Sequence, residues 1–198
     1  MRFISKILIC LAACCFPFIS CTNQKNPFNA NDAIMYEDSL RWTNHNIVGI
    51  ENIRCYYDYD DAIRAARKYK KPIMVFFTGI TCGGSRTMER KVLQKSGIAK
   101  KLCTDFIVAH LFADATRIQI PESEQYESST LGRRVTNLVD KNIDIQSSVY
   151  NTNTQPNIFF IDSNKNLLAE KRYSYDPNPE KFEKHLNEVL NKYNHINH

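Results

Sequence analysis

Residues 73–85 read IMVFFTGITCGGS, and this stretch decides the fold. The run from Ile73 to Thr78 is apolar almost throughout, which is typical of a strand buried on both faces of a parallel sheet. A short loop leads to Cys82 and two glycines, and apolar residues at helical spacing follow to about Leu102. Strand, loop and helix in this order predict an α/β domain that carries a cysteine between a buried strand and a helix.

Strand and helix patterns alternate on both sides of this stretch. Asp58 or Asp60 is a suitable N-cap for the helix before it, and Pro179 opens the last helix, where proline is favoured. The order predicts a mixed central sheet flanked by helices. The expected elements are a strand within 47–57, a helix from about 59 to 70, strands at 73–78 and 106–112, a helix at about 85–102, a helical piece near 127–140, strands at 157–161 and 167–172, and a helix from 179.

The composition supports one packed domain. The chain has 198 residues, 43% of them apolar, with 11 Phe and 10 Tyr, which excludes wholesale disorder. The five histidines are scattered and form no zinc-type pair with cysteines. The sequence contains no phosphate-binding loop, dinucleotide fingerprint or HExxH motif. We therefore expect no metal and no cofactor.

The first 20 residues differ from the rest. Arg2 and Lys6 precede the apolar run 7–19, which is too short to span a membrane and typical of a signal peptide. Ile-Ser-Cys at 19–21 resembles a bacterial lipobox, which predicts lipidation of Cys21. A second such box ends at Cys14, and an ordinary cleaved signal peptide is a further alternative. We expect a signal peptide at 1–20, a lipid-anchored tether at 21–46 and a domain at 47–198, facing the periplasm from the bacterial envelope.

Loss of the leader changes the charge and the cysteine count. Removal of Arg2 and Lys6 lowers the net charge from +5 to +3. The basic residues within 64–71 and 86–101 are interpreted as solvated helix faces, so we expect no nucleic-acid partner. Three thiols remain beyond Cys21, and an odd number leaves at least one unpaired within the chain. They are Cys55, Cys82 and Cys103.

Several short stretches stand out by their order and spacing: Asp58–Ala62, Lys71-Pro72, Phe77–Gly79, Cys82, Met88-Glu89, Asp114, Gln155-Pro156 and Tyr175-Asp176. Together they resemble the C-terminal periplasmic thioredoxin-like domain of bacterial thiol:disulfide interchange proteins. The resemblance implies a thioredoxin fold with an insertion before the strand that follows a cis proline, Pro156; a trans proline opening a strand is the alternative. It also implies protein substrates bound as extended chains beside Thr81, Gly83, Gly84, Gln155 and Pro156.

The chain departs from this family at two positions. The family's active site is Cys-x-x-Cys, whereas here it reads Cys82-Gly-Gly-Ser85. The family also places a buried acid six residues before the first cysteine, where Phe76 stands here. The two changes fit each other, because a proton shuttle has no task without a second thiol.

Cys82 is the candidate nucleophile, since a helix N-terminus stabilises a thiolate; an inert buried cysteine is the alternative. The two glycines weaken the helix and predict that it begins at Ser85. Ser85 is then either an N-cap or a hydrogen-bond donor to the thiolate. Asp114 is either a family site residue or a loop cap.

A mixed disulfide on Cys82 needs a second thiol for release. Cys103 lies beyond the expected straight helix, about 24 Å from its start. In the fold that the resemblance implies, Cys55 ends the first strand, at the same sheet edge as Cys82 and about 10 Å from it. Cys55 is therefore the possible resolving thiol, and a core residue is the alternative.

These features predict a lipid-anchored protein that exchanges thiols and disulfides through one active cysteine. Its partners would be cysteine-containing proteins and a thiol reductant protein. The alternative is a redox-silent module that binds extended protein segments. A structural lipoprotein, with its groove filled by residues 114–154, is the third interpretation.

Overall fold

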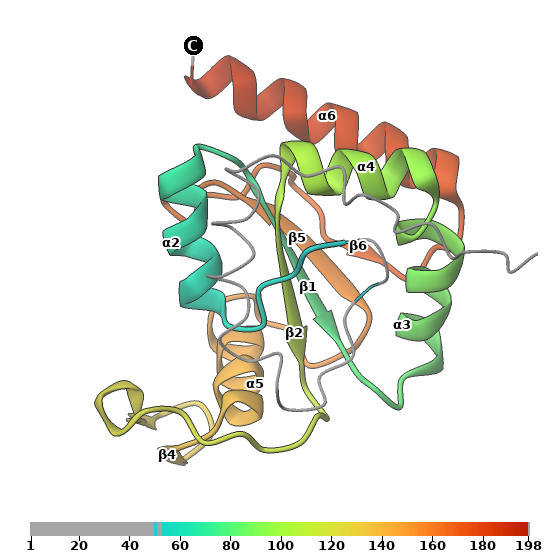
Figure 1. The fold of residues 1–198 in the computed structure, drawn as a ribbon. Helices are drawn as coiled ribbons and strands as arrows, with labels where there is room; N and C mark the ends of the chain where they lie inside the picture. The colour runs from blue at the N-terminus through green and yellow to red at the C-terminus, as the bar shows by residue number, and fades with distance from the viewer. Residues whose placement is uncertain (1–49, 51–52, 198) are drawn as a thin grey trace, which may run out of the picture.

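The computed structural model describes residue 50 and residues 53–197 (Figure 1). The predicted signal peptide, the lipidation of Cys21 and the tether at 21–46 lie outside these residues. Within the described part, no helix has the length and apolar character to cross a membrane.

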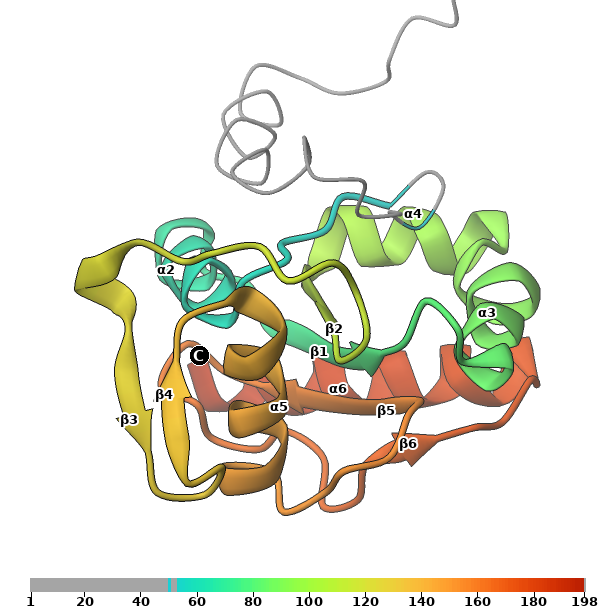
Figure 2. The same cartoon turned by 90° about the horizontal axis from the view of Figure 1, so that it is seen from below.

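A four-stranded mixed sheet forms the centre of the domain. Strand β1 (Ile73–Thr78) lies between β2 (Ile107–Phe112) and β5 (Asn157–Ile161), and β6 (Tyr173–Ser174) forms one edge (Figure 2). β1 runs parallel to β2 and antiparallel to β5. All residues of β1, β2 and β5 are buried, because helices cover both faces of the sheet. The predicted thioredoxin fold, a mixed sheet flanked by helices, is confirmed.

Two apolar clusters lie on the two faces of the sheet. Helix α2 (Tyr59–Tyr69), capped by the Asp58 side chain, packs on Val75 and Phe77. The opposite face carries the other large cluster. Most of its helical residues come from α3 (Gly83–Met88), the π-helical turn η2 (Glu89–Leu93), α4 (Ser96–Asp105) and α6 (Pro179–Asn197), and one more is Leu138.

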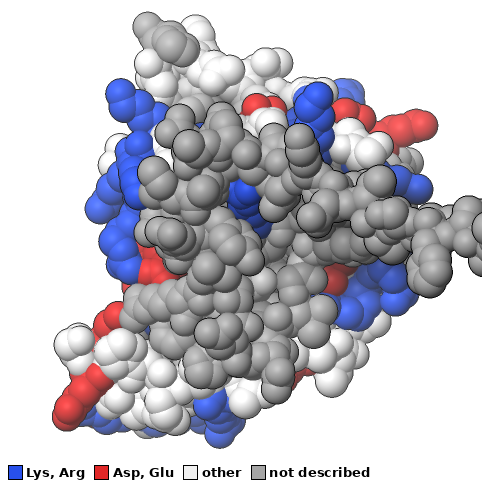
Figure 3. All heavy atoms as spheres, in the orientation of Figure 1, with Lys and Arg blue, Asp and Glu red and all other residues white. Residues whose placement is uncertain are grey.

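The basic residues expected on a solvated helix face lie on α2. Arg64, Arg67 and Lys68 are exposed, and Figure 3 shows Lys and Arg gathered over α2 at the left of that face. Arg67 donates to the Ser163 carbonyl and Arg64 pairs with Asp61, so part of this charge holds local structure.

The expected helix near 127–140 is wrong. A hairpin of β3 (Tyr126–Ser128) and β4 (Arg133–Val135) lies there, after a short 3-10 turn, η3 (Glu122–Glu124), and helix α5 (Leu138–Ser148) follows. Asn137 starts α5, because its side chain accepts a hydrogen bond from the Asp140 N–H. The carboxylate of Asp144 in α5 accepts hydrogen bonds from Tyr126 and Ser128, which holds the hairpin against the helix.

The expected helix at 85–102 is also corrected. The helix begins at Gly83 and is interrupted at Gln94 and Lys95 before α4 starts. Leu93 and Ile98 are both buried. In one continuous helix their side chains would point about 140° apart, so the interruption allows both to enter the same cluster.

Two expected strands are shorter than predicted. Of the strand expected within 47–57, the described residues 50 and 53–57 show a single parallel bridge, between Tyr56 and Ala109. The strand at 167–172 is replaced by a bridge from Leu167 to Ile161 and by β6 at 173–174. Residues 170–172 are all charged and exposed, and a regular hairpin would turn part of this run toward the core.

Candidate active site

Cys82 occupies the N-cap position of α3, directly after the loop that follows β1. Its carbonyl accepts the first helical hydrogen bond, from Arg86, and its N–H donates to the Gly79 carbonyl. The helix therefore begins at Gly83, directly beside the cysteine. The start at Ser85 that we predicted from the two glycines is wrong. The first N–H groups of a helix have no partner within the helix, so a helix N-terminus in general favours negative charge.

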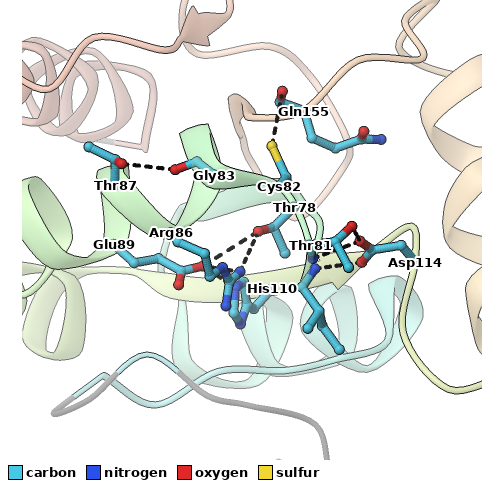
Figure 4. A network of polar contacts seen from close by, with 11 residues as sticks. Thr78, Thr81, Cys82, Gly83, Arg86, Thr87, Glu89, His110, Asp114 and Gln155 are labelled. Atoms are coloured by element: carbon cyan, nitrogen blue, oxygen red, sulfur yellow. Dashed lines mark hydrogen bonds and ion pairs between the residues drawn. The ribbon is translucent and has the colours of Figure 1, made fainter.

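The loop before β5 faces this cysteine. The Gln155–Pro156 peptide bond is cis, and the Cys82 thiol donates to the Gln155 carbonyl over 3.5 Å (Figure 4). A methyl group at Gly84 would lie 3.2 Å from Pro156 Cδ, whereas one at Gly83 would meet nothing within 4 Å. Gly84 thus permits the close approach of the cis-proline loop, and Gly83 leaves the cysteine open on its other side.

Helix α5 holds the cis-proline loop through hydrogen bonds of Gln146. The Gln155 side-chain amide donates to Gln146 Oε1 over 2.9 Å, and Gln146 Nε2 donates to the Thr154 carbonyl over 2.8 Å. Asn157 adds a hydrogen bond to the same carbonyl at 2.6 Å. The segment between β2 and β5 therefore positions the loop that faces Cys82.

Asp114 holds the loop on the other side of the cysteine. Its carboxylate accepts hydrogen bonds from the Ile80 N–H, the Thr81 N–H and the Thr81 hydroxyl over 2.5, 2.9 and 2.6 Å (Figure 4). Burial raises the pKa of Asp114, but these hydrogen bonds and the charge of Arg86 outweigh it and leave the pKa below its ordinary value. The geometry is that of a loop cap, one of the two roles predicted for Asp114.

A buried polar network lies under the cysteine loop. Glu89 Oε1 receives hydrogen bonds from Arg86 over 2.7 Å and pairs with His110 Nε2 over 3.0 Å, and Arg86 also donates to Thr78 over 2.9 Å (Figure 4). Burial lowers the pKa of His110, although Glu89 opposes the shift. Phe76, at the position of the family's acid, stacks on the His110 ring. The buried carboxylate of this network is that of Glu89, in the turn that follows α3.

Sequence reasoning missed this network. Two signals were visible: His110 interrupts an apolar strand, and Glu89 belongs to one of the stretches that match the family. Their meeting could not be read from spacing, because 21 residues separate them along the chain.

Ser85 stands where the family has its second cysteine. The side chain is fully buried, and its Oγ has no hydrogen-bond partner among the described residues. Ser85 is not the N-cap, because Cys82 occupies that position. Its hydroxyl also makes no hydrogen bond to the Cys82 sulfur within the described part of the chain.

None of the three described cysteines forms a disulfide bond with another described residue. Cys55 is 4% exposed and its thiol donates to the Ile53 carbonyl over 3.7 Å. Burial raises the pKa of Cys55 strongly, which disfavours the thiolate that a resolving role needs. Cys103 is half-buried and packs against the same apolar cluster. These surroundings favour the core interpretation of Cys55, which the sequence had left open.

The described residues contain no cluster of metal ligands. No group of three or more His, Cys, Asp or Glu side chains there is placed to hold a metal ion. The chemical groups at the site are those of Cys82, the neighbouring backbone and the buried network.

Comparison with known proteins agrees with this geometry. Residues 54–164 match the model of a family described as thioredoxin-like. A solved DsbH oxidoreductase is 20% identical with a TM-score of 0.52, and the match covers 68% of this chain and 82% of that one. A thioredoxin from Thermus thermophilus is also 20% identical, with a TM-score of 0.51 and coverage of 74% and 94%. No curated protein sequence matches. The chain is a member of the thioredoxin-like family.

Proposed function

We propose that this protein exchanges thiols and disulfides with cysteine-containing proteins through Cys82 alone. The observation that carries the proposal is a half-buried thiol at a helix N-cap, facing a cis-proline loop, with serine in place of the second thiol. We further propose that Cys21 anchors the chain by lipid to the bacterial envelope, with the domain facing the periplasm.

The proposed reaction has two exchange steps. The Cys82 thiolate attacks one sulfur of a substrate disulfide, the substrate's other sulfur leaves as a thiolate and takes up a proton, and a mixed disulfide remains on Cys82. A thiolate of a separate reductant protein then attacks the substrate sulfur of this mixed disulfide, and Cys82 leaves as a thiolate. The reductant now carries the substrate until its own second thiol releases it. Ser85 takes no part in the electron transfer, because a hydroxyl cannot replace a thiol in this exchange.

The loops around Cys82 are suited to an extended substrate segment. The Gln155 carbonyl lies at the cysteine sulfur, and the open side of Gly83 leaves room for a passing chain. A substrate strand beside Pro156 would bind by backbone hydrogen bonds, as peptides do when they extend a sheet. The roles proposed for Thr81, Gly83, Gly84, Gln155 and Pro156 are of this kind.

A second candidate function is a binding module without redox chemistry. Phe76 and Ser85 support it, because neither the acid nor the second thiol of the Cys-x-x-Cys enzymes is present. Such a module would use the same cis-proline groove for extended segments and would leave the sulfur unreacted.

The test is the rate at which oxidised glutathione forms a mixed disulfide on each cysteine of the full-length chain, followed by site-resolved mass spectrometry. We expect Cys82 to react at least about 10-fold faster than Cys103 of the same molecule, which is an internal control for a half-buried thiol. Added dithiothreitol should remove the adduct, and a Cys82→Ser variant should form none at that position. Reaction of Cys82 no faster than Cys103 would overturn the exchange proposal and leave the binding module.

A further inference from the structure

A groove lies next to the candidate active site, between β6 and the first half of α6. Its volume is about 530 Å³. Tyr173 and Ser174 of the edge strand form one wall, and Lys181, Lys184 and His185 of α6 form the other. Figure 2 shows β6 at the edge of the sheet with α6 alongside. We call this hollow the β6–α6 groove.

The charged residues of the β6–α6 groove are mostly basic. Its lining contains four Lys or Arg side chains against Asp176 and Glu188. Asp176 is paired with Lys181. Lys171, Arg172 and Lys184 are exposed and have no carboxylate partner among the residues that the structure describes. The groove thus offers unpaired positive charge at its rim.

Two polar atoms of the groove residues are buried without a partner. They are the Tyr173 hydroxyl and His185 Nε2, neither of which has a hydrogen-bond partner within the described part of the chain. Tyr173 is 9% exposed, and its ring lies 5.4 Å from the His185 ring. A buried polar group that is left unpaired has lost its hydrogen bonds to water without replacement, which costs free energy. An oxygen acceptor bound here would receive the hydroxyl hydrogen bond and remove that cost.

Tyr175 brings the β6–α6 groove close to the cysteine site. Tyr175 lines the groove, and its ring lies 3.4 Å from the position of a methyl group on Gly84, two residues from Cys82. Ser174 donates to Asn157 Oδ1, and Asn157 holds the residue before the cis-proline loop. A substrate segment that passes Cys82 and the loop therefore reaches this groove next.

We infer that the β6–α6 groove binds aspartate or glutamate side chains in the substrate segment that flanks the target cysteine. The inference rests on the proposed function and adds a substrate class to it, namely proteins with an acidic stretch beside the reactive cysteine. Lys171, Arg172 and Lys184 attract the carboxylates, and the Tyr173 hydroxyl donates to one of them.

The test compares two fluorescent peptides in binding to the full-length chain. Both carry serine in place of the target cysteine, and one has three aspartates after it where the other has three asparagines. Binding is measured by fluorescence polarisation, so no disulfide chemistry enters the reading. We expect the acidic peptide to bind more tightly and to lose affinity as salt rises.

Two matched double variants distinguish binding in the β6–α6 groove from a general effect of the protein's net charge. Lys171→Ala with Lys184→Ala should weaken binding of the acidic peptide about 2- to 30-fold, the range for loss of two exposed ion pairs. Lys91→Ala with Lys100→Ala removes the same charge elsewhere on the surface and should leave the affinity unchanged. Tyr173→Phe should weaken the acidic peptide and spare the melting temperature, since the hydroxyl has no partner in the described part of the free chain.

Equal losses in the two double variants, or equal affinity for the two peptides, would overturn the inference. Binding of anionic lipid vesicles through Lys171 and Lys184 without binding of the acidic peptide would also overturn it. Failure here is distinct from failure of the proposed function. Cys82 reactivity without preference for acidic peptides refutes only the groove, and groove binding with an unreactive Cys82 refutes only the exchange reaction.

Discussion

Lys141→Ala should destabilise the domain more than any ordinary surface substitution. Lys141 lies in α5, and its Nζ lies 2.8 Å from Asp58 Oδ2 and 2.8 Å from Asp60 Oδ2. The lysine side chain is 6% exposed and that of Asp58 is not exposed at all. Asp58 also caps α2, so this ion pair joins the segment between β2 and β5 to the first helix.

The magnitude follows from the burial of the partner that remains. Without the lysine, the partners left to the Asp58 carboxylate among the described residues are the N–H groups of Asp60 and Asp61. Breaking a buried ion pair in this way costs about 3–5 kcal/mol. In a domain of this size that corresponds to a fall in melting temperature of about 6–20 °C. Lys141→Met keeps most of the side-chain volume and should lose nearly as much, because the missing interaction is electrostatic.

The assay is urea unfolding of the full-length chain, followed by circular dichroism and by thermal scans. Lys100→Ala is the matched control, since Lys100 is an exposed lysine in a helix, and its substitution should change the free energy of unfolding by less than about 0.5 kcal/mol. A loss under about 1 kcal/mol for Lys141→Ala would refute the reasoning, and so would equal losses in the two variants.

The ion pair that Lys141 forms with Asp60 predicts a pH dependence of stability. Burial raises the pKa of Asp60, but Lys141 outweighs it and holds the pKa below 3.8. Burial lowers the pKa of Lys141, but Asp58 and Asp60 outweigh it and hold the pKa above 10.5. The stabilisation is therefore full between pH 3.8 and 10.5, and it declines as acid protonates the carboxylate or as base deprotonates the lysine. The stability difference between wild type and Lys141→Ala should shrink outside that window.

Four substitutions test the cysteine site, one of them, Gly83→Ala, as a control. Gly84→Ala should slow mixed-disulfide formation, because the new methyl group would lie 3.2 Å from the cis-proline ring. The methyl group of Gly83→Ala meets nothing within 4 Å, so this variant should react at the wild-type rate. Equal rates for the two variants would contradict the close approach of the proline loop to Gly84. Ser85→Cys places a second thiol three residues after Cys82 on the same helix face, so an internal disulfide should form and appear as a loss of two hydrogen masses. Persistence of two free thiols under oxidation would refute that geometry. Asp114→Ala removes three hydrogen bonds from the cysteine loop and should cost about 1 kcal/mol in urea unfolding, with no loss expected below the pH at which the carboxylate is protonated.

Local sequence patterns were sufficient to predict the elements whose signals lie in a few adjacent residues. The apolar run at 73–78 and the run at 157–161 are strands with the expected bounds. Asp58 caps α2 and Pro179 opens α6, because capping and proline geometry depend on a few adjacent residues. The same reasoning placed Cys82 between a buried strand and a helix.

Predictions failed where the choice depended on distant partners. The hairpin at 126–135 exists because Asp144 binds its hydroxyl groups, and nothing within that segment shows such a partner. The helix after Cys82 is interrupted so that Leu93 and Ile98 can enter one cluster. Both outcomes are tertiary contacts that override local preference.

The site itself divides in the same way. The motif at 82–85 predicts the active cysteine and the missing second thiol, and the motif at 155–156 predicts the facing proline. Each of these features lies within a short motif that can be recognised in the sequence. The network of Arg86, Glu89 and His110 and the β6–α6 groove have no such motif. They arise where a helix, a strand and an edge strand meet, so only the packing of those elements brings their charges together.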